Sequence, residues 1–218
     1  MTDKLINEAD IYARFAEYGV ATVYEASGRQ GLVNIPLIPV IPGRTVAGPA
    51  LTVLCGQGDN LMVHAAMAHV KPGDIIVMTM PEPAPVALIG ELLVTQAKVR
   101  GAAGILVDAA VRDVDVLRKM GLPIWTRYVR VLGATKTKLG AINEPVTVGG
   151  TSISPGDIVI MDDDGAVVVA AARVTEVLSA SQARVDREAK LRAKLEQGAL
   201  SYDLHGLRAL VEGKQASG

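Results

Sequence analysis

The sequence predicts an α/β fold with a long C-terminal helix, and three observations support this prediction. Apolar runs of strand length alternate with helical patterns between residues 72 and 126, as is typical of βαβ units. Two Pro-Gly-Asp-Ile turns, at 72–75 and 155–158, each precede a β-branched apolar run. Residues 171–197 form one long charged helical pattern. We therefore expect a single domain, 1–218, in which 171–218 is a C-terminal helical extension.

The composition excludes several classes of protein. Hydrophobic residues make up 50% of the chain and charged residues 21%, which is enough apolar material for a sizeable core. The 22 basic and 23 acidic residues form no basic stripe, so we expect no nucleic-acid partner. No apolar stretch reaches the roughly 20 residues of a membrane span, and the polar start lacks the apolar core of a signal peptide. With Cys55 as its single cysteine, the chain is expected in the cytoplasm.

The N-terminal third is expected to begin with two helices. The first covers residues 4–18 and is closed by Gly19. The second begins with Thr22 as its N-cap and Glu25 at the third helical position, which is the spacing of a capping box. Three further segments follow along the chain: an irregular Pro-rich crossing at 31–43, strand material at 45–55, and helical spacing at 59–70.

The middle of the chain alternates regularly. After the first Pro-Gly-Asp-Ile turn and its strand we expect helix 86–100, strand 104–110, helix 114–120 and strand 122–126, with right-handed crossovers. The strand after the second such turn is expected to partner the first. It then turns back through Asp164-Gly165 as a hairpin, so we interpret the run Asp162–Asp164 as a turn and not as a metal site.

A candidate site lies where this alternation leaves the core. Gly90 begins a helix, and the free N–H groups of the next residues, 91–93, can bind a carboxylate or phosphate. The following strand delivers Arg112 and Asp113 at its C-terminal end, which is where open α/β sheets bind ligands. We therefore expect Gly90 and the Arg112–Asp113 pair to border one pocket.

The residue types in this pocket indicate its chemistry. Asp113 is a suitable ligand for Mg²⁺, and Arg112 is suited to binding an oxyanion with its two-pronged guanidinium. The alternative is structural, because Asp113 would also make a good N-cap for the next helix. Asp108, inside the preceding strand, is a candidate to orient Arg112. Asp59-Asn60 precede a helix and are interpreted as capping residues, with a contribution to the pocket left open.

An acidic residue, 20 intervening positions and an Arg-Asp pair connect Glu91 to Arg112 and Asp113. This pattern resembles the class II pyruvate aldolases of the 4-hydroxy-4-methyl-2-oxoglutarate / 4-carboxy-4-hydroxy-2-oxoadipate aldolase family, which shares its fold with the RraA-type regulators of ribonuclease activity. Further stretches resemble the family in order: GVATVYEASGRQG, GDNLMVHAA, KPGDIIV, GAAGILVDAAVRDVDVL, LPIWTR and PGDIVIMDDDGAVVV. The resemblance implies a layered, swivelling β/β/α domain.

The resemblance also implies roles for individual residues. Asp113 would hold Mg²⁺ or Mn²⁺, and Arg112 would bind the 2-oxo oxygen and stabilise the pyruvate enolate. Gly90, Glu91, Leu92 and Leu93 would bind the substrate carboxylate, and Glu91 would also orient the site. Glu25 and Glu188 would be catalytic acids that reach the site from a neighbouring subunit of a trimer or hexamer, which the extension 171–218 contacts. Glu91 departs from the pattern, because the aldolases carry Asp there.

The expected activity is retro-aldol cleavage of a 4-hydroxy-2-oxo acid to pyruvate and a second 2-oxo acid, with oxaloacetate decarboxylation as a side activity. One alternative is a non-catalytic regulator of ribonuclease activity. Those regulators usually lack the acid after the arginine, whereas Asp113 is present here. Another alternative is an enzyme of the same enolate type whose main substrate is oxaloacetate or a related acid.

Overall fold

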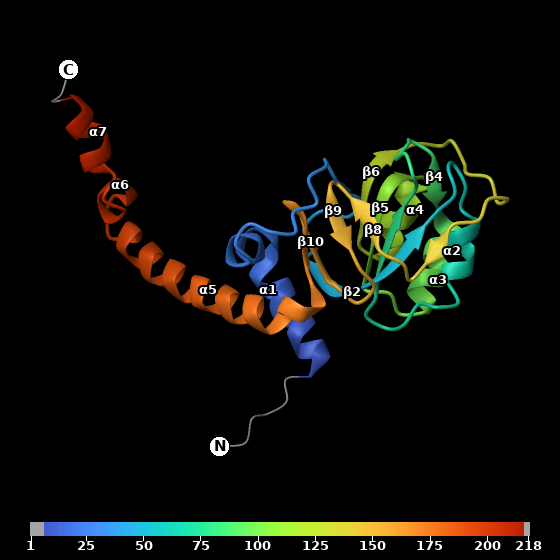
Figure 1. The fold of residues 1–218 in the computed structure, drawn as a ribbon, viewed down its shortest axis with the longest axis horizontal. Helices are drawn as coiled ribbons and strands as arrows, with labels where there is room; N and C mark the ends of the chain where they lie inside the picture. Colours follow the sequence, from blue (N-terminus) through green and yellow to red (C-terminus); the bar gives the residue numbers. More distant parts are fainter. Residues whose placement is uncertain (1–6, 216–218) are drawn as a thin grey trace. The chain divides into compact units, whose positions relative to one another are not determined.

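The computed structural model describes residues 7–215, and its contacts divide the chain into two compact units. One unit ends at Ser181 and the other begins at Gln182. The first unit holds every strand of the described residues together with the helices around them, and it confirms the predicted α/β class with β/β/α layers (Figure 1). The predicted long C-terminal helix is also confirmed, as α5 (Val174–Glu196).

A nine-stranded mixed sheet forms the centre of the first unit. Its main path runs in the order β1-β6-β5-β3-β2-β10-β11, while β4 pairs with β5 and β7 pairs with β2. The pairs β2–β3, β3–β5, β4–β5 and β5–β6 are parallel, as the alternation predicts. The strands are β1 (Ile38–Pro39), β2 (Val46–Leu54), β3 (Ile75–Thr79), β4 (Ala87–Ile89), β5 (Gly104–Val111), β6 (Ile124–Val129), β7 (Ala141–Ile142), β10 (Ile158–Asp162) and β11 (Gly165–Val169).

Strand β2 joins the parallel and antiparallel parts of the sheet. Its first half pairs antiparallel with β10, where Val46 lies opposite Met161. Its second half pairs parallel with β3, where Ala50 lies opposite Ile75. The two strands that follow the Pro-Gly-Asp-Ile turns are therefore not partners, because β2 lies between them, and that expectation was wrong. The hairpin through Asp164 and Gly165 is confirmed, because β10 and β11 pair along their whole length.

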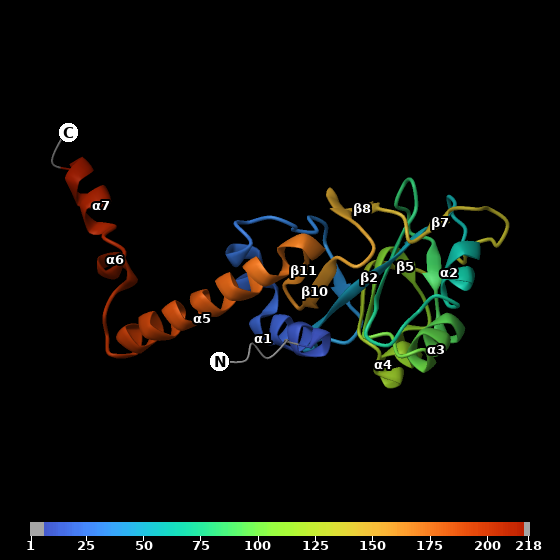
Figure 2. The same ribbon diagram turned by 60° about the horizontal axis from the view of Figure 1, so that its bottom comes forward.

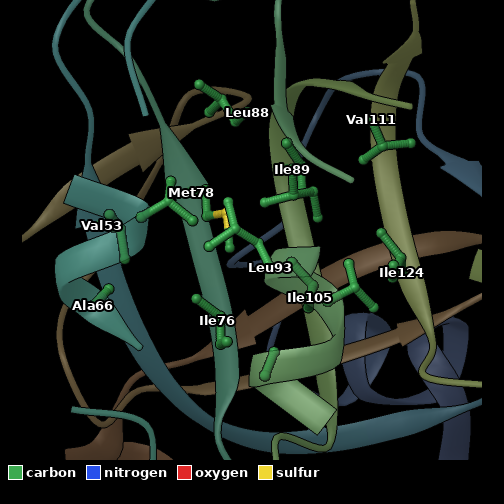
Figure 3. Packing of buried hydrophobic residues seen from close by; sticks show 14 of the residues in the cluster. Val53, Ala66, Ile76, Met78, Leu88, Ile89, Leu93, Ile105, Val111 and Ile124 are labelled. Atoms are coloured by element: carbon green, nitrogen blue, oxygen red, sulfur yellow. The ribbon is translucent and has the colours of Figure 1, made fainter. Parts of the chain in front are cut away.

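Three helices cover one face of the parallel strands (Figures 1 and 2). They are α2 (Leu61–Ala66), α3 (Glu91–Val99) and α4 (Val114–Met120). Alternate strand residues point toward them and form the largest core cluster, which Figure 3 shows around Ile76 and Met78. Both of these side chains are completely buried. Each buried aliphatic side chain of this size contributes roughly 1.5–3 kcal/mol of transfer free energy. The cluster therefore stabilises the packing of the three helices against the parallel strands.

The opposite strand residues form a second cluster, which contains Val77, Leu106 and Trp125. A small two-stranded sheet of β8 (Val146–Val148) and β9 (Thr151–Ile153) supplies further apolar residues to it. A third cluster packs α1 (Glu8–Ala26) and the start of α5 against β10 and β11. The strand residues of β10 alternate between these two clusters, which explains why that segment is almost uniformly apolar.

Helix α1 is interrupted at Gly19, where the backbone takes φ 74° and ψ 169°. The helix break at Gly19 was predicted from the sequence, but the start of the second part was not. Thr22 lies inside that part and is not its N-cap, because the left-handed glycine starts the helix immediately. The cap comes from a distant strand: Val20 N–H donates to Asp162 Oδ2 at 2.8 Å.

A second correction concerns the expected helix 86–100. Its first residues form β4, and the helix α3 begins only after Gly90. Ala87 and Ile89 pair with the end of β5, so this segment extends the sheet next to the strand that carries Arg112. Because β4 pairs with β5, the start of α3 lies close to the end of β5.

The second unit begins within α5, and the regular structure of its described residues is helical. Two short helices follow α5, namely α6 (Ser201–Leu204) and α7 (Arg208–Gln215), where the sequence predicted only an extension. Several large apolar side chains here are exposed, among them Leu200 and Leu210. Across residues 7–215, no helix combines the length and the apolar character needed to cross a bilayer.

Candidate functional site

A pocket of about 150 Å³ lies where β4 and β5 end and α2 and α3 begin. It contains all the residues that the sequence placed around Gly90 and the Arg-Asp pair, which are Gly90, Glu91, Leu92, Leu93, Arg112 and Asp113. Segments about 20 residues apart in sequence meet here because β4 and β5 are neighbouring parallel strands. The predicted juxtaposition therefore exists in the fold.

Gly90 allows Asp113 to approach the start of α3. Its backbone is extended, with φ −153° and ψ −163°, so the glycine is not required for its backbone conformation. A Cβ atom at this position would lie 2.4 Å from Asp113 Oδ2 and 3.0 Å from Arg112 Cγ. At 2.4 Å the carboxylate would have to shift, so the absence of a side chain at Gly90 is what allows Asp113 to lie here.

Asp113 is held in an uncommon conformation. Its φ of 61° and ψ of 32° lie in the left-handed region, which Asp tolerates better than most residues and which is enriched at functional sites. Its backbone begins α4, but its side chain does not cap that helix. Instead, Oδ2 accepts a 3.0 Å hydrogen bond from Glu91 N–H at the start of α3. The side chain therefore crosses the pocket, which the capping interpretation does not explain.

Arg112 lies over the same pocket with its side chain half exposed. Its Nε is 3.8 Å from Asp113 Oδ2, which is a loose ion pair. Its Nη1 would lie 2.9 Å from a Cβ placed on Gly133, so a second glycine makes room for the guanidinium. The Arg112 guanidinium therefore lies at the pocket and remains available to an anionic ligand.

Three pocket residues were not identified as a group from the sequence, namely Asn60, His64 and Lys136. Burial and then the charge of Lys136 lower the pKa of His64, which keeps its imidazole neutral at pH 7. Asn60 is 8% exposed, and its Nδ2 donates to Leu88 O, whereas within residues 7–215 nothing donates to its buried Oδ1. These residues come from α2 and from the loop 130–140, and no spacing in the sequence connects them.

Asp108 does not orient Arg112, contrary to expectation. It lies on the opposite face of β5 and pairs with Arg127, with 3.0 Å between Oδ1 and Nη1. Burial raises the pKa of the Asp108 carboxyl, and Arg127 opposes this shift. Asp108 lies inside β5, and its partner Arg127 comes from the neighbouring strand β6, whereas Arg112 follows the end of β5.

The two acids expected from a neighbouring subunit are not brought into this pocket within the first unit. Glu25 lies at the end of α1 and pairs with Arg29 at 3.2 Å. Glu188 lies in the second unit, on α5, where it pairs with Arg184 at 2.7 Å. Their roles depend on an assembly of several chains and stay predictions.

The donor set fits one kind of metal ion better than others. The described part of the chain contains no group of three or more His, Cys, Asp or Glu side chains that could hold a metal. A zinc centre of the usual kind needs at least three protein ligands, so the pocket does not match it. Mg²⁺ commonly binds one or two carboxylates and keeps several waters. Asp113 offers such a carboxylate, with its side chain 39% exposed and Oδ1 free of hydrogen bonds from residues 7–215.

The arrangement is suited to an anionic, oxygen-rich ligand. Arg112 and Lys136 supply positive charge, and the start of α3 adds the N–H groups of Leu92 and Leu93, which have no acceptor in the described residues. Asp113 adds a carboxylate between them that can hold a cation. A small acid that chelates a divalent cation would satisfy all of these groups together.

Comparisons with known proteins agree with this fold. The family profile described as "RraA-like: Aldolase/RraA" matches residues 20–168. A protein of Halalkalibacterium halodurans, named "Putative 4-hydroxy-4-methyl-2-oxoglutarate aldolase", is 33% identical over 208 residues. The match covers 94% of this chain and 95% of that protein.

Two solved structures are similar in backbone as well as in sequence. Streptomyces coelicolor RraAS2, described as an unusual member of the RNase ES inhibitor RraA protein family, gives a TM-score of 0.75 at 29% identity. The alignment covers 85% of this chain and 97% of that one. A Geobacillus kaustophilus protein, described as an S-adenosylmethionine: 2-dimethylmenaquinone methyltransferase, gives 0.63 at 28% identity, covering 69% and 93%. The two proteins are described by different functions, whereas the fold is shared.

Proposed function

The chain belongs to the RraA-like family described as Aldolase/RraA, and on this premise we propose that it is a divalent-metal-dependent lyase. The proposed reaction is retro-aldol cleavage of a 4-hydroxy-2-oxo acid to pyruvate and a second 2-oxo acid. Candidate substrates are 4-hydroxy-4-methyl-2-oxoglutarate and 4-carboxy-4-hydroxy-2-oxoadipate. One observation carries the proposal: Asp113, Arg112 and the start of α3 face one pocket.

Each part of the pocket has a role in this reaction. A bound Mg²⁺ or Mn²⁺, held through Asp113, would supply Lewis acidity toward the 2-oxo acid. The Leu92 and Leu93 N–H groups bind the substrate carboxylate with help from the helix dipole. Arg112 donates to the 2-oxo oxygen and stabilises the negative charge that develops there when a base removes the C4 hydroxyl proton, C4 becomes a carbonyl and the C3–C4 bond breaks. The enolate then takes up a proton at C3 and leaves as pyruvate. Because the same charge develops during decarboxylation, we expect oxaloacetate decarboxylation as a side activity.

Lys136 and His64 extend the site beyond the reacting carbons. Lys136 lines the same pocket as Arg112, so the pocket contains two cations of different shape. Both candidate substrates carry a carboxylate on C4 in addition to the one next to the keto group. We propose that Lys136 binds this second carboxylate while the neutral His64 donates a hydrogen bond to it.

The proposed function is tested by measuring pyruvate release with lactate dehydrogenase. Purified protein with Mg²⁺ should release pyruvate from 4-hydroxy-4-methyl-2-oxoglutarate, and a chelator should abolish the activity. Asp113→Ala should abolish it as well, whereas Asp115→Ala should not, because Asp115 lies two residues further on with its side chain 90% exposed. Unchanged pyruvate release in Asp113→Ala, or none from any 4-hydroxy-2-oxo acid with the wild type, contradicts the proposal. Comparing kcat/KM on oxaloacetate shows whether decarboxylation is the main activity.

We further propose that the active assembly is a homo-oligomer, a trimer or a hexamer, in which Glu25 and Glu188 act across subunits. Light scattering after gel filtration measures the mass of the assembly. Glu188→Gln should then lower kcat without changing that mass. A fully active monomer would contradict this part of the proposal.

A regulatory function is the second candidate, and it is favoured by the likeness to RraAS2 over 97% of that chain. Under this proposal the protein inhibits a ribonuclease and the pocket has no catalytic role. Purified RNase ES provides the test: inhibition by the wild type and equally by Asp113→Ala would support it. No inhibition at a large excess of protein would contradict it.

A further inference from the structure

The loop 130–140 carries part of the pocket although most of it is exposed. Among its residues, Lys136 and Ala134 line the pocket, and only Ala134 is partly buried. The loop contains no strand longer than an isolated bridge. An exposed loop without regular structure needs a specific attachment if it is to hold a charged side chain in one place.

That attachment is Asp59, which is completely buried beneath the loop. Its Oδ2 accepts hydrogen bonds from Thr135 Oγ1 and Thr137 N–H, both at 2.6 Å, and a longer one of 3.4 Å from Thr137 Oγ1. The two residues that Asp59 binds are the immediate neighbours of Lys136. The lysine is therefore at the centre of a short segment fixed at both sides.

The same carboxylate also holds the opposite wall of the pocket. Asp59 Oδ1 accepts from Leu61 N–H at 2.8 Å and so caps the start of α2, which carries His64. The backbone adds two bonds to the loop: Asn60 N–H donates to Thr135 O, and Thr135 N–H donates to Gly58 O. One buried side chain thus fixes both α2 and the loop.

A carboxylate is better suited to this position than an amide. The N–H groups of Leu61 and Thr137 can only donate, and each binds a different oxygen of Asp59, so an asparagine would direct its NH₂ group toward one of them. Burial opposes ionisation of Asp59, but the hydrogen bonds from Thr135, Thr137 and Leu61 outweigh it and lower the pKa of the carboxyl. Asp59 is therefore anionic under ordinary conditions and does not lie in the pocket itself, because it is absent from the residues that line it.

We propose that Asp59 is a positioning residue that fixes Lys136 in the pocket and thereby selects ligands with a second anionic group. It touches neither substrate nor metal, and it acts through the loop. The kinetic test of this proposal rests on the proposed function, because it compares two 4-hydroxy-2-oxo acids as substrates. These are 4-hydroxy-4-methyl-2-oxoglutarate, which has the second carboxylate, and 4-hydroxy-2-oxopentanoate, which lacks it.

The experiment compares Asp59→Asn, Lys136→Met and the double variant with the wild type. For the diacid, Asp59→Asn should raise KM about tenfold with kcat nearly unchanged, as expected when binding common to ground and transition states is lost. For the monoacid both constants should stay within about twofold, and the double variant should be no worse than Lys136→Met alone. Hydrogen exchange of the 131–139 amides should be faster in Asp59→Asn.

Asp157→Asn is the matched control. Asp157 is also buried, and its carboxylate accepts from Ser154 N–H and Ala171 N–H, but it does not line the pocket with Lys136. The control should leave the ratio of kcat/KM for the two acids unchanged. Equal losses on both acids in Asp59→Asn, or unchanged exchange of the loop amides, would overturn the proposal.

If the wild type cleaves neither acid, the proposed function fails and this inference is judged by binding. Calorimetry with Mg²⁺ then compares pyruvate with 2-oxoglutarate, which carries a second carboxylate. Selective loss of 2-oxoglutarate affinity in Asp59→Asn supports the positioning role. Equal affinities of wild type and variant for both acids, or no binding of either acid, overturn it.

Discussion

Replacing Gly90 by alanine is the most direct test of the site, because the structure gives the size of the perturbation. The backbone at Gly90 is extended, so alanine adds no backbone strain. Its Cβ would lie 2.4 Å from Asp113 Oδ2, whereas an ordinary contact begins at 3.4 Å. The carboxylate must therefore move by about 1 Å, a displacement that can cost roughly a hundredfold in rate at a catalytic site.

The expected loss can be worked out from the bond that this movement breaks. The hydrogen bond from Glu91 N–H to Asp113 Oδ2 is 3.0 Å long and does not survive such a displacement. A hydrogen bond to a charged group contributes about 1.5–3 kcal/mol. If that bond aligns Asp113 in the transition state, kcat/KM should fall roughly tenfold to hundredfold. Thermal unfolding by circular dichroism should show a stability loss no larger than this bond.

The assay is pyruvate release together with Mn²⁺ binding followed by electron paramagnetic resonance. Gly133→Ala serves as a graded control, because its Cβ would meet only the end of the Arg112 side chain, at 2.9 Å. Gly90→Ala should weaken Mn²⁺ binding and Gly133→Ala should not. Full activity and unchanged Mn²⁺ affinity in Gly90→Ala would refute the reasoning about Asp113.

Three further predictions concern single residues. Arg112→Lys should lower kcat/KM at least tenfold with little change in melting temperature, because lysine lacks the planar fork, and a loss below twofold would contradict this. Ile76→Ala should cost about 2–5 kcal/mol of unfolding free energy in urea and Ile76→Val about 0.5–1.5, since Ile76 is fully buried in the main core. Asp59 has a pKa below its ordinary 3.8, so its stabilisation is present above that pH and is lost as the pH falls below it. The stability difference between wild type and Asp59→Asn in urea should therefore stay constant between pH 7 and pH 5 and shrink as the pH falls below 3.8, and a difference that stays constant down to pH 2 would argue against an ionised Asp59.

The parts of the fold that the sequence predicted have strong local signals. Helix α4 was predicted at its observed bounds, between the Arg-Asp pair and Gly121, which takes a left-handed conformation at its C-cap. The hairpin of β10 and β11 was predicted from Asp164-Gly165. The position of β2 between β3 and β10 was not, because two similar turns say nothing about which strand lies between the segments that follow them.

The residues of the candidate site can likewise be divided into those that the sequence predicted and those that it did not. Arg112, Asp113 and the start of α3 were predicted together because ligands bind at the C-terminal ends of strands in open α/β sheets, and Gly90 was expected to begin a helix there. Lys136, by contrast, is an exposed residue of a loop with no helical or strand period, and only the folded structure shows that it lines the pocket. Asp59 and Asn60 were both interpreted as capping residues. Asp59 Oδ1 does accept from Leu61 N–H, whereas Asn60, at the N-cap position, makes no side-chain cap hydrogen bond, and the contacts of Asp59 Oδ2 were not predicted.

The pairing of β2 also has a consequence for how the chain reaches its native state. Val46 is made early, but its antiparallel partner Met161 emerges from the ribosome only after most of the sheet has been synthesised. Contacts of such long separation slow folding, because the intervening chain must be ordered before they form. During translation the edge of β2 that faces β10 is therefore open to pairing with other chains. Recovery of native protein should then depend on concentration during refolding, with Asp162, which caps the second part of α1, among the last residues to find its place.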